Sequence, residues 1–168
     1  MANALVVGRF QPFHNGHMEL IEHLSKMYEK VVIVIGSADQ SGTIENPFTA
    51  KEREEMIRLA LTAKGIKNFT IGAVRDFHND RLWAYAVKKC AERSTVFTRN
   101  PWTLRCLRNS GMKVRKNKFY SHKRYSGREI RRRIAAGKKW DTLVPPEVFS
   151  YIMSNRGAER VKKLAGSK

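Results

Sequence analysis

Short apolar runs alternate along the chain with longer stretches in which apolar residues recur every three or four positions. The clearest run, residues 31–35, is β-branched throughout and ends at Gly36. Such a run is typical of a strand covered on both faces, whereas the three-to-four spacing is typical of a helix with one buried face. The runs therefore predict strands at residues 5–7, 31–35, 69–71 and 95–98, with a further short strand beginning at 113–114.

The segments between these runs carry helix signals. Leu20, Ile21, Leu24 and Met27 share one face of a predicted helix over 16–28. Capping-box patterns at residues 49–52 and 126–129 predict the starts of two more helices, the second running to about residue 136. Further helices are predicted over 82–90, over 101–111, after the Pro145–Pro146 pair and after Gly157.

Strand–helix alternation with buried strands predicts an α/β fold: a Rossmann-like, doubly wound parallel sheet with helices on both faces and a small helical C-terminus. We expect one domain over residues 1–168, with the C-terminal helical part at about 126–168. In such sheets ligands bind beyond the carboxyl ends of the strands, where the strand order reverses. The segments after residue 7, after residue 35 and at 98–100 are predicted to meet at that edge.

The chain carries a formal net charge of +18, which indicates attraction to polyanions. Ten of the twenty-one residues over 113–133 are Lys or Arg, and Glu129 is the only acid among them. A solvated face is the plainer interpretation of such a run, but clustered like charges repel unless an anion relieves them. Cys90 and Cys106 show no metal-binding spacing and are interpreted as buried or half-buried thiols in a reducing cytoplasm.

Residues 8–17 read Gly-Arg-Phe-Gln-Pro-Phe-His-Asn-Gly-His and follow the first predicted strand. His14 and His17 stand at the predicted start of a helix, where backbone N–H groups and the helix dipole attract anions. Imidazoles there can donate hydrogen bonds to phosphoryl oxygens. A P-loop, a GxGxxG fingerprint and a GxSxG nucleophile motif are absent from the sequence, and His14 and His17 have no apparent third zinc ligand.

This decapeptide resembles the GxFxPxHxGH signature of the HxGH nucleotidyltransferase superfamily, and residues 126–131 resemble its Ser-rich turn with Ile-Arg. Within that superfamily the chain is most similar to archaeal-type nicotinamide-mononucleotide (NMN) adenylyltransferases, over about residues 4–155. Residues 35–38, 46–53 and 131–133 carry the closer likeness. Arg128 departs from it, because the family pattern has a threonine there.

The resemblance implies the reaction of ATP with NMN to give NAD and pyrophosphate, with Mg²⁺ held through the phosphates and not by protein side chains. It implies a cytoplasmic homo-oligomer, with a hexamer as one form, and catalytic roles for His14, His17 and Arg131. The ATP-binding residues it implies are Gly8, Arg9, Phe10, His14, Gly16, His17, Ser126, Arg128, Ile130 and Arg131. The NMN-binding residues it implies are Gly36, Ser37, Phe77, Asn79, Asp80 and Trp83, while Trp102 and Trp140 are assigned to packing.

Three alternatives stay open at this point. The acceptor could be phosphopantetheine, FMN or glycerol phosphate instead of NMN. Trp83 could be a core residue on a helix instead of a stacking platform for the pyridinium ring. The positive charge could also indicate a nucleic-acid-binding protein, although the sequence has no RNP, helix-turn-helix or KH signature.

Overall fold

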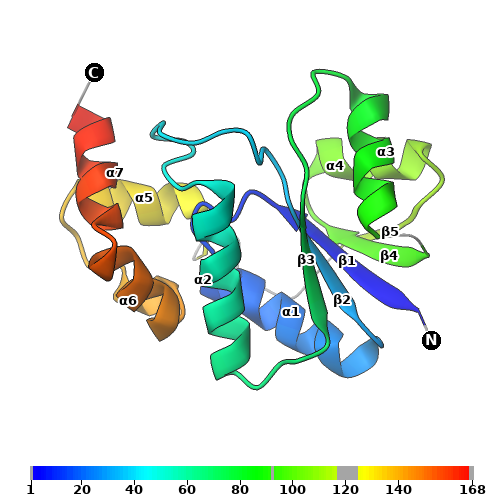
Figure 1. Ribbon diagram of the computed structural model, residues 1–168, viewed down its shortest axis with the longest axis horizontal. Helices are drawn as coiled ribbons and strands as arrows, with labels where there is room; N and C mark the ends of the chain where they lie inside the picture. The colour runs from blue at the N-terminus through cyan, green and yellow to red at the C-terminus, as the bar shows by residue number, and fades with distance from the viewer. Residues whose placement is uncertain (1, 92, 117–124, 167–168) are drawn as a thin grey trace. The chain divides into compact units, whose positions relative to one another are not determined.

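The computed structural model describes residues 2–91, 93–116 and 125–166 (Figure 1). Every strand and helix expected above is present within about two residues of its expected bounds, and one 3₁₀ turn is added. The elements are β1 (Asn3–Gly8), α1 (Asn15–Met27), β2 (Val31–Ile35), α2 (Ala50–Ala63), β3 (Phe69–Ala73), α3 (Asp80–Cys90), β4 (Ser94–Thr98), α4 (Pro101–Asn109), β5 (Lys113–Lys116), α5 (Gly127–Ala135), η1 (Asp141–Leu143), α6 (Pro146–Ser154) and α7 (Gly157–Gly166).

The five strands form one parallel sheet in the order β3-β2-β1-β4-β5, so the strand order reverses at β1 and the Rossmann-like prediction is confirmed. The chain divides into two compact units. The sheet unit comprises Met1–Arg9, Leu20–Asp39 and Ile66–Phe119. The helical unit comprises Phe10–Glu19, Gln40–Gly65 and Tyr120–Lys168. The expectation of a single domain stays a prediction.

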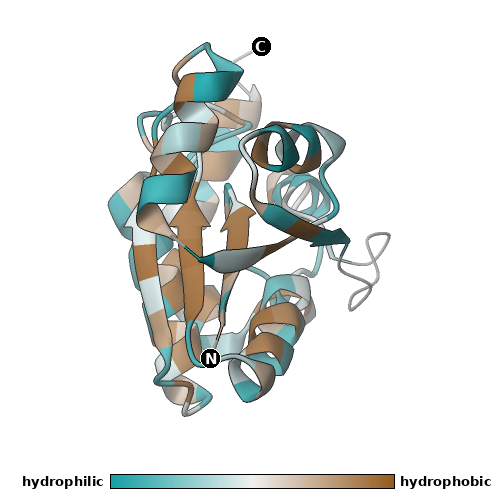
Figure 2. Ribbon diagram, turned by 90° about the vertical axis from the view of Figure 1, so that its right-hand side faces the viewer, coloured by the Kyte–Doolittle hydropathy of each residue, from teal (hydrophilic) through white to brown (hydrophobic). Residues whose placement is uncertain are grey.

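In the sheet unit, α3 and α4 cover one face of the sheet (Figure 1). Leu5 pairs in register with Val32 on one side and Val96 on the other, and all three belong to the core cluster under these helices. The alternate residues, such as Val6 and Ile33, are equally buried on the other face. There the Tyr28 ring, just beyond α1, contacts Phe97 at 5.5 Å. The central strands are accordingly almost wholly hydrophobic (Figure 2).

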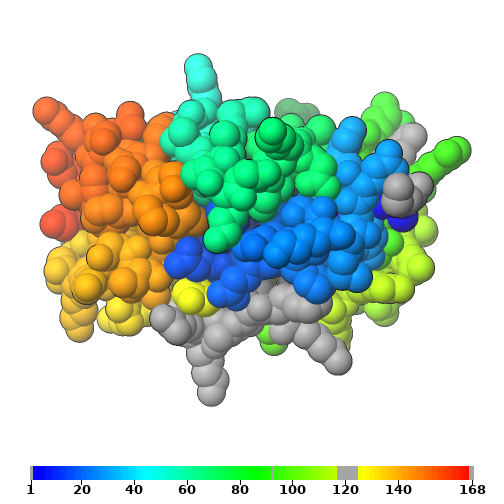
Figure 3. All heavy atoms as spheres, turned by 90° about the horizontal axis from the view of Figure 1, so that it is seen from below, coloured from blue at the N-terminus to red at the C-terminus, as the bar shows by residue number. Residues whose placement is uncertain are grey.

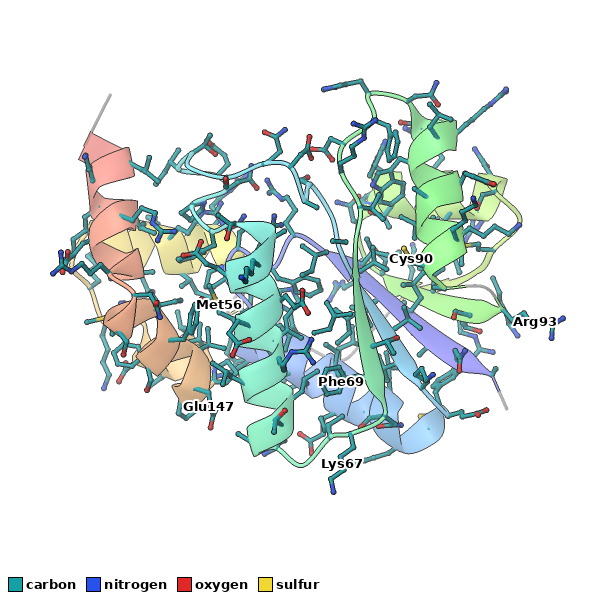
Figure 4. The ribbon with its side chains drawn as sticks, viewed as in Figure 1. Met56, Lys67, Phe69, Cys90, Arg93 and Glu147 are labelled. Atoms are coloured by element: carbon teal, nitrogen blue, oxygen red, sulfur yellow. The ribbon has the colours of Figure 1, made fainter. Side chains whose placement is uncertain are left out.

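The helical unit is built from α2, α5, α6 and α7. The capping box predicted at α2 is fully formed, since the Thr49 and Glu52 side chains each bond to the other's backbone N–H. Met56 is fully buried and extends from α2 toward the C-terminal helices (Figure 4). The outer surfaces of α2 and α6 lie side by side (Figure 3), flanking an open groove of about 440 Å³ that includes Leu59 and Tyr151.

Three expectations need correction or restriction. At α5 only half of the capping box is formed, because the Glu129 carboxylate accepts hydrogen bonds from Arg132 and Arg133 instead of the Ser126 backbone. Cys90 is exposed, at the end of α3 beside β3 (Figure 4), because it lies on the outer turn of that helix; Cys106 is buried as expected. Residues 117–124 of the basic run lie outside the described part of the chain. In that described part, no helix is long and apolar enough to span a membrane.

Candidate active site

The two histidines of the decapeptide form a stacked pair in the helical unit. Their ring centroids are 3.6 Å apart and the rings are inclined by only 15°. The backbone N–H of each histidine donates to Nδ1 of the other at 3.3 Å, and His17 N–H also donates to the His14 carbonyl at 2.9 Å. The first turn of α1 therefore fixes both imidazole rings through its own backbone.

This bonding pattern decides which ring nitrogen can face a ligand as a donor. A neutral imidazole carries one proton, and a nitrogen that accepts a hydrogen bond does not hold it. Because Nδ1 is the acceptor in both His14 and His17, the proton is assigned to Nε2 in both rings. Two Nε2–H groups on one turn are suited to donating to phosphoryl oxygens.

Aromatic side chains of the same decapeptide support the pair. Phe10 meets His17 edge-on with centroids 4.8 Å apart, and Phe13 stacks on His17 at 5.5 Å. Phe10 and Phe13 are both buried, and His14 is only 4 % exposed. Asn15, at the start of α1, donates to the Thr142 carbonyl at 3.0 Å. Packing and hydrogen bonds thus hold the turn in one conformation.

The N-terminus of α5 lies against this turn, within the same unit. Arg131 is 8 % exposed and its Nη1 donates to the Gln11 carbonyl at 2.6 Å. Gly127 permits the approach, since a Cβ there would come within 2.7 Å of the same carbonyl oxygen. The Ser126 hydroxyl caps the helix by accepting from Glu129 N–H. The structure therefore brings together the two motifs that lie more than 100 residues apart in the sequence.

The remaining predicted residues of this unit take different positions. Arg128 is exposed on the first turn of α5, where it adds a cation to the positive end of the helix dipole. Ile130 is fully buried and its N–H donates to the Ser126 carbonyl, so its side chain serves the core. Gly16 is buried in the first turn of α1, between the two histidines.

The sheet unit holds the other predicted residues, at and beyond the carboxyl ends of its strands. Gly8 ends β1 and its carbonyl accepts from Gly36 N–H at 2.9 Å, which joins the ends of β1 and β2. Arg9 follows and is exposed. The predicted meeting of these strand ends at one edge is confirmed within this unit.

Hydrogen bonds join the segments that follow β2 and β3. Ser37 has φ 48° and its hydroxyl donates to Asp76 Oδ1 at 3.1 Å. The Asp76 N–H donates in turn to Asp39 Oδ1 at 2.9 Å. Phe77 is half-buried against the core cluster, and the Arg75 guanidinium lies over its ring at 4.9 Å.

Asn79 and Asp80 begin α3, and the structure engages both side chains. Asn79 is the N-cap, its amide oxygen accepting from Arg81 N–H and Leu82 N–H. Asp80 accepts from the Trp102 indole at 3.1 Å and lies 3.6 Å from Arg105. The hydrogen bond from Trp102, followed by one from Cys106 and the charge of Arg105, lowers the pKa of Asp80.

Trp83 belongs to α3 and its side chain lies in the core cluster, with 4 % of its surface exposed. Its ring contacts that of Trp102 at 4.4 Å, and Trp102 is 38 % exposed. Trp102 therefore does more than pack, because it also orients Asp80. Trp140 is buried and packs on Phe149 at 4.7 Å, in agreement with its assignment to packing.

The Arg131 guanidinium reaches the histidine turn through the Gln11 carbonyl, and we call this arrangement of His14, His17 and Arg131 the histidine–arginine junction. Gln11 and Gly127, which build it, were not among the predicted site residues. Gln11 is 3 % exposed; its amide donates to the Phe48 carbonyl at 2.8 Å and accepts from Phe48 N–H at 3.0 Å. Gly127 fits beneath the Gln11 carbonyl. A polar glutamine between Phe10 and Pro12 could have indicated a buried hydrogen-bonding role, but nothing in the sequence marks Phe48 as its partner.

No group of three or more His, Cys, Asp or Glu side chains comes close enough to hold a metal ion in the part of the chain that the structure describes. The helical unit does bring together ring N–H donors, the Arg131 cation and the N-terminus of α5, which together suit a polyphosphate.

Proteins of similar sequence are nucleotidyltransferases, in agreement with a site suited to a polyphosphate. The cytidylyltransferase-like family model matches residues 5–133. The chain is 38 % identical to a nicotinamide-nucleotide adenylyltransferase of Methanolobus tindarius over 99 % of this chain and 96 % of the relative. It is 40 % identical to the one of Thermococcus sibiricus, covering 96 % of this chain and 88 % of the relative.

A solved structure extends the likeness of the fold. A bifunctional NMN adenylyltransferase/ADP ribose pyrophosphatase from Francisella tularensis, complexed with AMP and a Mn ion, superposes with a TM-score of 0.83 at 22 % identity. The match covers 98 % of this chain and 52 % of that protein, so the chain spans about half of the bifunctional protein.

Proposed function

The chain belongs to the cytidylyltransferase-like family and is a nucleotidyltransferase related to the nicotinamide-nucleotide adenylyltransferases, and on that premise we propose that it forms NAD and pyrophosphate from ATP and NMN. The phosphate oxygen of NMN attacks the α-phosphorus of ATP. One O–Pα bond forms while the bond from Pα to the β-phosphate oxygen breaks, and pyrophosphate leaves with the electron pair. No covalent enzyme intermediate is required.

The observation that carries this proposal is the junction of the stacked His14–His17 pair with Arg131 in one unit. In-line phosphoryl transfer needs positioning and charge neutralisation more than acid–base chemistry. We assign the two Nε2–H groups to the α-phosphoryl oxygens, with His17 nearest. Arg131 and the N–H groups at the start of α5 hold the β- and γ-phosphates, with Arg128 of the same helix as a supporting cation. The role of Arg9, in the sheet unit, as an ATP-binding cation stays a prediction. Ser126 keeps the end of α5 in its donor geometry.

For the acceptor we propose the segments that follow β2 and β3 in the sheet unit. Gly36 and Ser37 are small residues beside a strand end, which lets a ligand approach the backbone. Phe77, Asn79 and Asp80 supply an aromatic face and polar atoms near it. Trp83 supports this surface from beneath as a core residue, so its predicted stacking on the pyridinium ring stays a prediction.

We propose that Mg²⁺ accompanies ATP and is held by triphosphate oxygens. Mg²⁺ keeps most of its water ligands and is commonly bound through substrate phosphates, which supports this arrangement. When bound, it neutralises charge on the phosphates. The expectations of a cytoplasmic location and of a homo-oligomer stay predictions; light scattering of the purified protein tests the latter.

A panel of phosphorylated acceptors with ATP, followed by pyrophosphate release, tests the proposed function. We expect release with NMN and formation of NAD, and much slower release with phosphopantetheine, FMN or glycerol phosphate. Turnover confined to one of those three would overturn the choice of acceptor. Tight binding of duplex DNA at physiological salt, with no ATP chemistry, would favour the nucleic-acid alternative instead.

A further inference from the structure

Gln11 connects two separate parts of the helical unit, the segment before α2 and helix α5. Its backbone carbonyl accepts from Arg131, and its side-chain amide forms two hydrogen bonds with the backbone of Phe48, one to the carbonyl and one from the N–H. The pair joins positions 37 residues apart and is almost fully buried. Gln11 also sits only three residues before His14, in the turn that carries the histidines.

The Phe48 end of this pair is itself fixed from two sides. Phe48 is 1 % exposed and packs against Gly157 of α7, where a Cβ would come within 2.9 Å of the ring. Arg160, also on α7, donates to the Pro47 carbonyl at 3.2 Å and to both carboxylate oxygens of Glu52. The Phe48 backbone, which bonds to the Gln11 amide through both its N–H and its C=O, therefore has little freedom to move.

The Gln11 carbonyl in turn restricts the guanidinium. Arg131 has a long side chain with several rotatable bonds, and a phosphate contact requires its planar fork in one orientation. The 2.6 Å bond to Gln11 fixes Nη1, and Gly127 leaves no space between the carbonyl and α5. An error of about 1 Å in such a contact costs on the order of 100-fold in rate.

We propose that Gln11 is a positioning residue for phosphoryl transfer. Its side-chain amide, anchored on the backbone N–H and C=O of Phe48, holds the Gln11 backbone carbonyl in place for Arg131 and so sets the guanidinium for the triphosphate. Gln11 acts through Arg131 and need not touch the substrate. The inference rests on the proposed function for its kinetic readout, and on the described geometry for everything else.

A double-mutant cycle tests it. Gln11→Ala is expected to lower kcat by about 100-fold with a smaller change in the KM for NMN, because misplacing Arg131 weakens a transition-state contact. In an Arg131→Ala background the same substitution is expected to cost less than about threefold, since the group it positions is gone. Equal losses in both backgrounds, or an unchanged kcat in Gln11→Ala, would overturn the inference.

A second substitution separates positioning from a loss of folding. In Gln11→Glu an ionised carboxylate can accept from Phe48 N–H but cannot donate to the Phe48 carbonyl, whereas the protonated acid does both. Burial disfavours the charged carboxylate, and lowering the pH protonates it. The ratio of the kcat of Gln11→Glu to that of wild type at the same pH is therefore expected to rise from about pH 8 to about pH 6. A ratio that stays flat with pH contradicts the role of the amide. Gln40→Glu, at the other glutamine of the chain, is the matched control and is expected to show a flat ratio near one.

Gly127→Ala approaches the same contact from α5. The added Cβ would lie 2.7 Å from the Gln11 carbonyl oxygen and would force that carbonyl and α5 apart. A loss of kcat comparable to that of Gln11→Ala is therefore expected. Gly166→Ala on α7 has no heavy atom within 4 Å of the added methyl and serves as the control. A Gly127→Ala variant with wild-type kcat would contradict the inference.

Failure of the proposed function gives a different result. If wild type forms no NAD, the acceptor proposal fails, and titration calorimetry with tripolyphosphate then decides the inference. Gln11→Ala is expected to weaken tripolyphosphate binding at least tenfold in the wild-type background and not in Arg131→Ala. Equal affinities of wild type and Gln11→Ala would overturn it.

Discussion

The candidate residues of the helical unit and those of the sheet unit are held in different ways. In the helical unit His14, Gln11 and Arg131 are all at least nine-tenths buried, and the hydrogen bonds described above join their side chains to backbone groups. In the sheet unit Asn79 and Asp80 are exposed, and Ser37 and Asp80 form hydrogen bonds with other side chains, those of Asp76 and Trp102.

Burial explains what each construction can do. A buried donor bonded to backbone cannot reorient cheaply, so the histidine–arginine junction is set before a ligand arrives, as stabilisation of a developing charge requires. Exposed polar groups lose little when they exchange partners with water or ligand. We therefore expect substitutions in the helical unit to change kcat and substitutions in the sheet unit to change the KM for the acceptor.

The largest expected effect is at His17. His17→Ala removes an Nε2–H donor from the proposed α-phosphoryl contact, and kcat for NAD formation is expected to fall by about 100- to 1000-fold. His23→Ala, on the same helix and outside the proposed site, is the control and is expected to retain near wild-type turnover. Near wild-type turnover in His17→Ala would remove the histidine pair from the mechanism.

Trp83 gives an intermediate effect that sharpens the comparison. As a core residue, Trp83→Ala is expected to destabilise the protein by roughly 3–5 kcal/mol, measured by urea unfolding. Trp83→Phe keeps an apolar ring in the core and is expected to leave the KM for NMN within about threefold. A tenfold rise in that KM with an unchanged midpoint of unfolding would instead favour direct stacking on the pyridinium ring.

The smallest effect concerns Glu129, which lies in the first turn of α5. Hydrogen bonds from Arg132 and then Arg133 lower the pKa of Glu129 from 4.5 to about 2. A depressed carboxyl pKa stabilises the folded state above the unfolded value, and this contribution is lost as pH falls from about 4.5 to about 2. Wild type should lose more of its Tm over that range than Glu129→Gln does, and 1 M salt should shrink the difference because the pairs are exposed. Equal pH profiles would contradict this assignment.

The sequence determined much of the fold. Continuous apolar runs, helical three-to-four spacing, Gly36 and the caps at Thr49 and Ser126 locate nearly every element, because these signals act over a few neighbouring residues. The decapeptide also identified the histidine turn, since a helix start with donors is a local feature. The sequence pattern was insufficient where one side chain had two possible sets of partners. The Glu129 carboxylate could have bonded to the helix cap but accepts hydrogen bonds from Arg132 and Arg133 instead.

Only the tertiary structure decided which distant residues share a contact. The hydrogen bond from Arg131 to the Gln11 carbonyl joins positions 120 residues apart. Nothing in the sequence marks the Phe48 backbone as the group that anchors the Gln11 amide. Likewise Trp83 became a core residue and Trp102 the half-exposed one because α3 and α4 pack on the same face of the sheet. Such outcomes depend on how surfaces fill space and satisfy buried polar groups, and spacing along a chain does not encode either.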